Sequence, residues 1–346
     1  MREPVGRRLP GLLLAILLPA LATRAHAQTI PEQPRGDYQT WSNPVVLQAS
    51  YKDGPSPDAT GSAAREPFFV EPTPQAERTN LPWRDNFSVL GGIDGAKGPE
   101  DLGISANFGF RFAVQTAGPL VADWGLGLQI GTGVNYHRTA TRFLHLDTGV
   151  RDRDQWFSTI GLFQRTDCGI NWGIAYDVLA EHYYSDFTLG QWRAQIGYQI
   201  DETSEIGVWG TLRERGDSVL VSRTPLTVEP INQYALFLRH IWPTGVMTRG
   251  WLGLAEEHGR FILGGPAYTQ AHHPFLFGAD VYIPLSDSWA IFGEANFITP
   301  NDSGTVTAFL GLVYYPSATA GTALRNRFAP LLPIANNPSF GVNVVP

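Results

Sequence analysis

Long segments of alternating apolar and polar residues dominate the chain from residue 87 onward, and they constrain the fold more than any other feature. In Trp124–His137 one face carries mainly Trp, Leu, Ile, Val and Tyr, and the other carries Gly, Gln, Asn and His. Gly190–Ile200 and Trp289–Ile298 repeat the pattern. Successive side chains of a strand point to opposite faces of a sheet, so this period of two predicts β-strands with one apolar face.

A soluble sandwich and a membrane barrel both produce such alternation, but they turn the apolar face inward and toward lipid, respectively. Three features favour the membrane barrel. The segments have roughly 10 to 14 residues, whereas globular strands have about 5–6 and membrane strands about 9–11. The polar face carries mainly small or uncharged residues, as in a crowded lumen. Aromatic residues such as Trp124, Trp289 and Tyr314 lie at the strand ends of the apolar face, where interfacial girdles form.

The fold class predicted is all-β, an antiparallel up-and-down transmembrane β-barrel of about 12 strands. Compact connections alternate with three long ones, Arg138–Asp154, Glu214–Ile231 and Glu257–His273, as in barrels with short periplasmic turns and long outer loops. An even number of strands then predicts both chain termini on the periplasmic side. The predicted strands are Phe87–Asp94, Leu102–Ala113, Trp124–His137, Gln155–Arg165, Gly169–Tyr184, Phe187–Ile200, Ser204–Arg213, Gln233–Trp242, Thr248–Glu256, Pro274–Ile283, Trp289–Ile298 and Gly304–Tyr315.

The N-terminus predicts export. Three arginines precede a short apolar stretch, Leu9–Ala22, and Ala25-His26-Ala27 follows, so residues 1–27 have the organisation of a cleaved signal peptide. Residues 28–82 are rich in Pro, Ser, Thr and Gln without a persistent period, which predicts a disordered linker. The barrel is predicted over 83–316, with a C-terminal extension over 317–346. The expected location is the outer membrane of a bacterial cell, with its lipid as a partner.

The extension contains an unusual string, R-N-R-F-A-P-L-L-P-I-A-N-N, from Arg325 to Asn337. From roughly Leu81 to the C-terminus the chain resembles an uncharacterised planctomycete-type family of predicted outer-membrane-like β-barrel proteins, and R-F-x-P-L-L-P-x-A-N-N is the most distinctive part of the resemblance. The resemblance implies a barrel but no activity. Two alternatives stay open for the extension. It docks as a proline-stiffened peptide in the periplasmic mouth, where Glu205 or Glu294 meets its arginines, or it lies free or binds a separate partner.

Few residues have a pattern that predicts chemistry, so neither an enzyme nor a cofactor is expected. The formal net charge of −7 argues against a nucleic-acid partner, because phosphates need a basic face. His182 and His240 lie on apolar faces without a serine two residues on. The adjacent His272 and His273 point to opposite faces of a strand, so no metal site is predicted. Cys168, the one cysteine, is expected to be inert.

Charged residues on the polar faces form the candidate site, a barrel lumen. Five cations oppose five acids, which gives no selectivity by sign. They either line a pathway for small solutes, as in porins, or pair across strands and fill the barrel, and a twelve-stranded barrel lies between filled and open sizes. The leading hypothesis is porin-like passage of small solutes, and the alternative is a non-conducting anchoring barrel that acts through its loops or tails; a lipid-acting barrel enzyme ranks below both. The predicted lumen-lining residues are Arg111, Arg165, Asp177, Glu181, Arg193, Glu205, Arg213, Arg239, Asp280 and Glu294.

Overall fold

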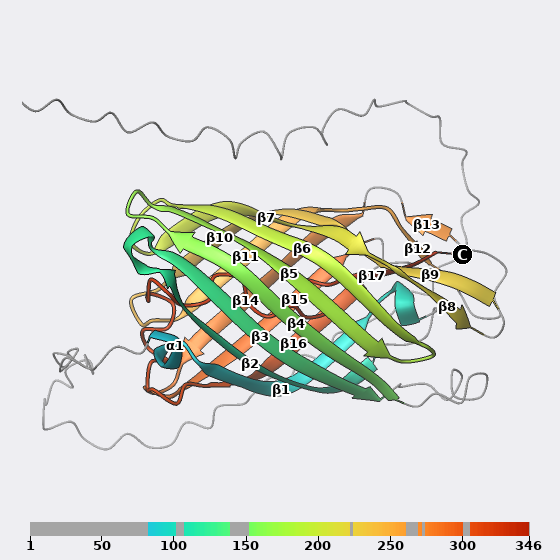
Figure 1. Cartoon of the computed structure of the whole chain (residues 1–346), viewed down its shortest axis with the longest axis horizontal. Helices are drawn as coiled ribbons and strands as arrows, with labels where there is room; N and C mark the ends of the chain where they lie inside the picture. The colour runs from blue at the N-terminus through green and yellow to red at the C-terminus, as the bar shows by residue number, and fades with distance from the viewer. Residues whose placement is uncertain are drawn as a thin grey trace, which may run out of the picture. The chain divides into compact units, whose positions relative to one another are not determined.

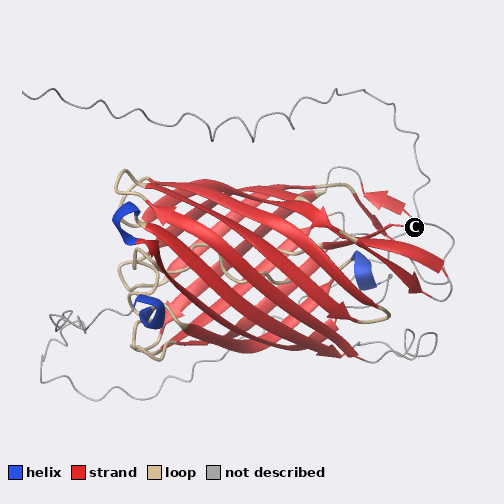
Figure 2. Ribbon diagram, viewed as in Figure 1, coloured by secondary structure: helices blue, strands red, loops and turns tan. Residues whose placement is uncertain are grey.

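A computed structural model describes residues 82–101, 107–138, 152–221, 224–260, 269–271, 274–299 and 305–345. The predicted signal peptide, almost all of the predicted linker, and His272 and His273 lie outside these ranges. Twelve antiparallel strands close into a barrel in the order β1-β16-β15-β14-β11-β10-β7-β6-β5-β4-β3-β2 (Figures 1 and 2). β1 and β16, the first and last barrel strands along the chain, pair with each other and close the barrel, with Val89 opposite Tyr314 and Lys97 opposite Val306. The predicted all-β barrel of about 12 strands is confirmed.

Each of the twelve predicted strands corresponds to one barrel strand, with differences of a few residues at the ends. The largest shift is in the second strand, which was expected from Leu102 and which the structure describes from Asn107 to Val121. The barrel strands are β1 (Ser88–Lys97), β2 (Asn107–Val121), β3 (Leu126–Arg138), β4 (Asp152–Arg165), β5 (Ile170–His182), β6 (Asp186–Gln199), β7 (Ser204–Arg215), β10 (Gln233–Ile241), β11 (Met247–Ala255), β14 (Phe275–Pro284), β15 (Trp289–Ile298) and β16 (Thr305–Tyr314).

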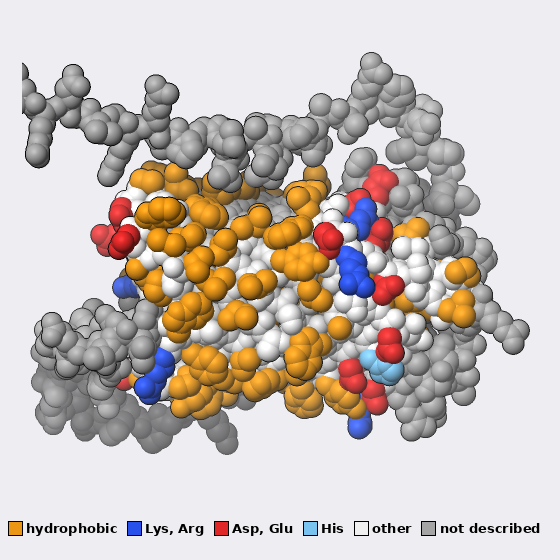
Figure 3. Space-filling model, in the orientation of Figure 1, with side chains coloured by type: hydrophobic (Ala, Val, Ile, Leu, Met, Phe, Trp, Pro, Cys, Tyr) orange, Lys and Arg blue, Asp and Glu red, His pale blue; other side chains and the backbone are white. Residues whose placement is uncertain are grey.

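The apolar face of each barrel strand points outward, as in a transmembrane barrel. In β3, Ile130 and Val134 are 50% and 38% exposed, whereas Gln129 and Asn135 on the opposite face are 3% and 2% exposed. The space-filling view shows apolar side chains over the middle of the barrel wall and charged ones gathered at its rim (Figure 3). Exposed apolar residues on one side and buried polar residues on the other fit a wall between lipid and a polar lumen.

The two ends of the barrel differ. At the turn end lie α1 (Pro82–Asp85), the one-turn η3 (Ala122–Trp124) and the compact connections between strands. At the loop end lie η2 (Pro99–Asp101) and two additional small sheets (Figure 1). None of the described helices has the length and apolar character needed to cross a membrane. The small sheets consist of β8 (Asp217–Val221), β9 (Thr224–Pro230) and β17 (Val342–Val345), and of β12 (His258–Arg260) and β13 (Thr269–Ala271).

The additional sheets correct the prediction for two long connections. Glu214–Ile231 was expected as a loop, but β8 and β9 form a hairpin within it, and β17 adds a third strand to β9. Val219, Leu226 and Val344 pack into an apolar cluster at this end of the barrel. The five additional strands are too short, at three to seven residues, to carry a long alternating pattern, which is why the sequence did not predict them.

Residues 316–345, the C-terminal segment, run along the inside of the barrel. The segment leaves β16 at the turn end, where the Tyr282 hydroxyl donates a hydrogen bond to the Ala320 carbonyl (2.8 Å). It ends as β17 at the loop end (Figure 1). The expectation of a C-terminus on the side of the turns is therefore wrong, because an even strand count fixes where the last barrel strand ends and not where the chain after it goes.

Candidate functional site: the lumen and the C-terminal segment

Most of the predicted lumen charges form ion pairs on the inner face of the barrel. Arg111 pairs with Glu294 (2.5 Å) and Arg193 with Asp177 (2.9 Å). Arg239 pairs with Glu205, which lies directly opposite it on β7. Burial of a charge is costly unless an opposite charge and hydrogen bonds compensate it, and these pairs supply that compensation. The seven predicted residues placed within the wall are Arg111, Asp177, Arg193, Glu205, Arg239, Asp280 and Glu294.

The other three predicted residues lie near the ends of the barrel. Glu181 pairs with Arg153 near the loop end (2.7 Å). Arg213 pairs with Glu229 and Glu256, also at the loop end, and its side chain is 30% exposed. Arg165 lies at the turn end, where its guanidinium donates hydrogen bonds to backbone carbonyls of the C-terminal segment.

Sequence reasoning missed several charged residues of the lumen, two of which are arginines. Arg249, whose Nε lies 2.7 Å from Asp280, occupies an inner position of a strand that was predicted, so the alternation contained the signal. Arg153 was missed because its strand was predicted to start at Gln155, whereas β4 starts at Asp152.

The lumen wall supplies hydrogen bonds to the backbone of the C-terminal segment. The Gln129 Oε1 accepts from the amides of Leu331 (3.0 Å) and Leu332 (3.1 Å), and its Nε2 donates to the Leu332 carbonyl. The Thr159 hydroxyl accepts from the Ala335 amide (2.9 Å), and Arg193 donates to the Pro333 carbonyl (2.6 Å). A buried backbone that forms no sheet needs such partners. The polar inner face therefore satisfies the backbone of the C-terminal segment.

The two asparagines of the distinctive motif contact acids of the wall. The Asn336 side-chain amide donates to Glu294 (2.5 Å), and that of Asn337 donates to Asp94 (3.2 Å). Asp94 is also 2.8 Å from the imidazole of His137, a pair that sequence reasoning missed. The expected contact of Glu205 or Glu294 with arginines of the extension is wrong, since Glu205 pairs with Arg239 and Glu294 with Arg111.

Apolar side chains of the C-terminal segment pack against the wall between these polar contacts. Leu331 packs with Phe163, and the Phe340 ring lies edge-on to Phe157, with 6.1 Å between centroids. A Cβ atom on Gly131 would lie only 2.5 Å from Cγ1 of Ile334, so glycine at this inner position makes room for the segment. The alternative of a free extension is therefore wrong for residues 316–345.

We expect Gln129→Leu to loosen the C-terminal segment. The substitution leaves the buried amides of Leu331 and Leu332 without an acceptor, which costs about 1–3 kcal/mol for an unsatisfied group. Hydrogen exchange of those two amides should accelerate, and the free energy of unfolding in urea should fall. Gln195→Leu is the matched control, since Gln195 is an inward glutamine of β6 that makes no hydrogen bond to the segment among the described residues. Equal effects of both substitutions would contradict this assignment.

A cluster of three carboxylates surrounds Arg153 near the loop end. Besides Glu181, Arg153 contacts Glu100 (3.0 Å) and Asp101 (3.5 Å), both in η2. Burial raises the pKa of Glu100 from 4.5 to about 7, although Arg153 opposes the shift. Burial also raises the pKa of Asp101. Three acids share one guanidinium, so the folded cluster favours a proton on Glu100.

The stability of the loop end should therefore decrease as the pH rises. Because the pKa of Glu100 is higher in the folded than in the unfolded chain, its contribution is present below about 4.5 and is lost as the pH rises toward about 7. Hydrogen exchange of η2 and β17 at pH 5 and pH 7.5 measures this loss. Glu100→Gln mimics the protonated acid, and this variant should lose less protection over that interval. A wild-type profile without pH dependence would contradict the shift.

One serine and one histidine meet at the turn end, although they are far apart in sequence. Ser204 and His240 lie opposite each other on β7 and β10, with 3.0 Å between Oγ and Nδ1. A nucleophilic pair needs a third group that orients the base. Among the described residues, no carboxylate forms a hydrogen bond with His240, whose ring instead meets Trp242 edge-on. Cys168 is exposed and lies 3.0 Å from the Thr166 hydroxyl.

Comparisons with solved structures return outer-membrane proteins at low identity. A mutant of the TodX monoaromatic hydrocarbon channel is 8% identical, with 67% of this chain and 90% of that chain covered and a TM-score of 0.42. The KdgM porin is 7% identical, with 65% and 98% covered and a TM-score of 0.35. Outer membrane phospholipase A from Escherichia coli is 6% identical, with 66% and 95% covered and a TM-score of 0.35.

The sequence comparisons agree with the extent of the barrel. No curated protein matches the chain. A family profile described as a family of unknown function (DUF6666) matches residues 86–342, which span the barrel and most of the C-terminal segment. The chain therefore belongs to the family of unknown function DUF6666.

Proposed function

We propose that this protein is an outer-membrane barrel, closed by its own C-terminal segment, that acts as an anchor and holds its loop end at the cell surface. The observation that supports this function is the course of the segment. It passes from the turn end to the loop end inside the barrel, and Gln129, Thr159 and Arg193 bind its backbone on the way. The proposal includes no catalytic step and no nucleic-acid partner.

The proposed orientation follows the usual asymmetry of bacterial barrels, which have short periplasmic turns and longer outer loops. The turn end would face the periplasm, and the sheet of β8, β9 and β17 would face the exterior. In this orientation the chain after Tyr315 crosses the membrane once more, inside the barrel. A peptide tag added after Pro346 should then bind antibody on intact cells.

Export by a cleaved signal peptide is part of the proposal. Cleavage after Ala27 would follow the Ala25-His26-Ala27 site, so the mature chain should begin at Gln28. N-terminal sequencing of protein from the membrane fraction tests this expectation. A membrane-inserted protein that retains Met1 would contradict it.

Porin-like passage of small solutes is the second candidate, favoured by the wall formed by β7, β10, β11 and β14. Arg239 pairs there with Glu205, and Arg249 with Asp280. Among the described residues, none of these four forms a hydrogen bond with the C-terminal segment. Charges on this wall would line a hydrated path if the segment moved away, since rings of charged side chains are common in ion and solute pathways.

A disulfide between the segment and the wall separates the two candidates. Gly131→Cys and Ile334→Cys, in a Cys168→Ser background, place two thiols where a Cβ on residue 131 approaches the Ile334 side chain. In planar bilayers an anchor should be silent both with and without the crosslink. Conductance that appears in the reduced protein and vanishes on oxidation would overturn the anchor proposal in favour of a gated porin.

A further inference from the structure

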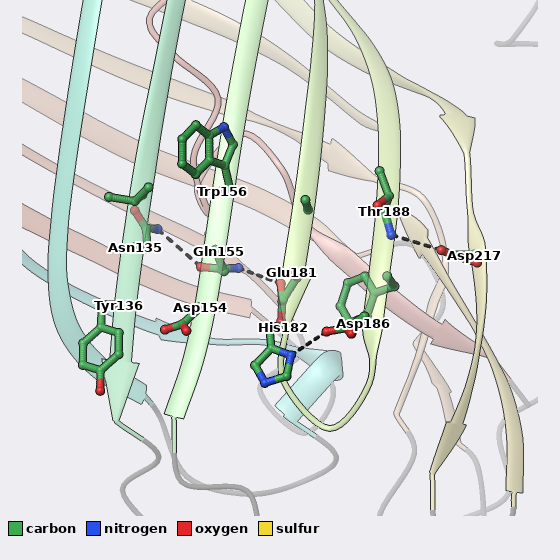
Figure 4. A pocket seen from close by; sticks show the side chains of 13 residues that line it. Asn135, Tyr136, Asp154, Gln155, Trp156, Glu181, His182, Asp186, Thr188 and Asp217 are labelled. Atoms are coloured by element: carbon green, nitrogen blue, oxygen red, sulfur yellow. Dashed lines mark hydrogen bonds and ion pairs between the residues drawn. The ribbon is translucent and has the colours of Figure 1, made fainter.

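A row of polar side chains crosses the outer surface of strands β3 to β6 near the loop end. The strand registers place Tyr136 opposite Asp154, Asp154 opposite His182, and His182 opposite Asp186. These side chains point outward and line a pocket of about 630 Å³ (Figure 4). Behind them, Asn135, Gln155 and Glu181 form a chain of inward hydrogen bonds that fixes the strands (3.3 and 2.9 Å).

A second, more apolar pocket continues from the first toward the middle of the barrel. Trp156 lines both pockets, whose volumes are about 630 and 430 Å³. The next outward row carries the short side chains of Thr132 and Ser158, which lie opposite each other. Ile130 and Ile160 form the row after that. Short side chains between Trp156 and the isoleucines leave a groove on the lipid-facing surface.

The length of the groove matches one leaflet of a membrane. Ile160 follows Asp154 by six residues on the same strand, which is about 20 Å at 3.3 Å per residue. With the strand tilt of about 35–45° usual for such barrels, the depth is about 15 Å, half of a hydrocarbon core of about 30 Å. A molecule with a polar head beside Asp154 and an acyl chain along Ser158 would fit both parts.

The charges of the polar end favour a cationic head. The pocket is lined by the aspartates Asp154, Asp186 and Asp217, and by Glu181, whose charge is balanced by Arg153. His182 lies 2.5 Å from Asp186, and Asp217 accepts from the Thr188 amide (3.0 Å). The carboxylate of Asp154 accepts no hydrogen bond within the described part of the chain.

Aromatic rings stand beside that carboxylate. Tyr136 and Trp156 flank Asp154 on the outward face, and both are exposed. An ammonium group is attracted both by a carboxylate and by the faces of aromatic rings. A phosphate alone would be repelled by the acids of the pocket.

We propose that this groove binds one outer-leaflet phospholipid with an amine-bearing headgroup, its ammonium at Asp154 and one acyl chain along Thr132 and Ser158. The site lies outside the barrel and does not depend on whether the lumen is closed. It does rest on the membrane location and orientation of the proposed function.

Native mass spectrometry of the full chain in detergent tests the site. The protein is incubated with phosphatidylethanolamine or phosphatidylglycerol of identical acyl chains. We expect one phosphatidylethanolamine to be retained several-fold more than phosphatidylglycerol. Asp154→Asn should abolish this preference, and Ser158→Leu, which fills the groove, should reduce retention of both lipids. Asp123→Asn at the turn end and Ala279→Leu on the outer face of β14 are the matched controls and should change neither.

Equal retention of the two lipids by the wild type, or a preference that survives Asp154→Asn, would overturn the site. The measurement in detergent does not depend on orientation in a cell. The proposed orientation is read separately, by antibody access to a C-terminal tag, so that failure of the lipid site and failure of the anchor proposal give different results.

Discussion

Deletion of residues 320–346 is expected to convert a silent barrel into a conducting one. The twelve-stranded ladder does not include the C-terminal segment, so the barrel should still close through the pairing of β1 with β16. Removal of Leu331, Leu332 and Ile334 empties the space beside β3 and β5, and water would then reach the inward charges. Single-channel recording in planar bilayers should show discrete steps for the deletion variant and none for the full chain.

A shorter deletion controls for damage to the loop end. Removal of residues 342–346 takes away β17 but keeps the part of the segment that lies along Gln129, Thr159 and Arg193. This variant should remain silent if the luminal part closes the barrel. A long-deletion variant that folds, as judged by its strand content in circular dichroism, and yet conducts no ions would contradict the closure. In that case the ion pairs of the wall would be the barrier to ion passage.

Ile196→Arg is expected to cost about 2–4 kcal/mol of barrel stability if the residue lies near the bilayer midplane. Ile196 lies in the second half of β6, points outward and is 42% exposed, so an arginine there would meet lipid. Leu128→Arg on β3 should have a similar effect, because Leu128 also lies on the outward face. Urea unfolding of protein refolded into lipid vesicles measures the change.

Gln195→Arg, one position away, is the control for the change in size and charge. Gln195 is 6% exposed and points inward, where Glu205 of the neighbouring strand lies near Gly197. An inward arginine should therefore cost much less than an outward one. Gln129→Arg is not a suitable control, because Gln129 holds the C-terminal segment through three hydrogen bonds. Equal costs at positions 195 and 196 would mean that the outer face does not contact lipid.

The barrel could be predicted from the sequence because its signal is local and repeated. Each barrel strand carries its own alternation, and residues such as Ile130 and Gln129 were assigned to the correct faces without knowledge of their neighbours. Inward positions of charged residues such as Arg111 and Glu294 follow from the same period. The choice of ion-pair partners does not, because it depends on the register between strands that are distant in sequence.

The sequence by itself determined the barrel strands, their faces and the number that closes the barrel, since side chains of a strand alternate whatever lies beyond it. Only the tertiary structure decided that the lumen is occupied. The prolines of the C-terminal segment exclude a regular helix or a central strand and leave its path open. That path is set by long-range contacts such as Gln129 with Leu332 and Asn336 with Glu294. Hydrogen bonds between residues so far apart in the chain leave no periodic trace in the sequence.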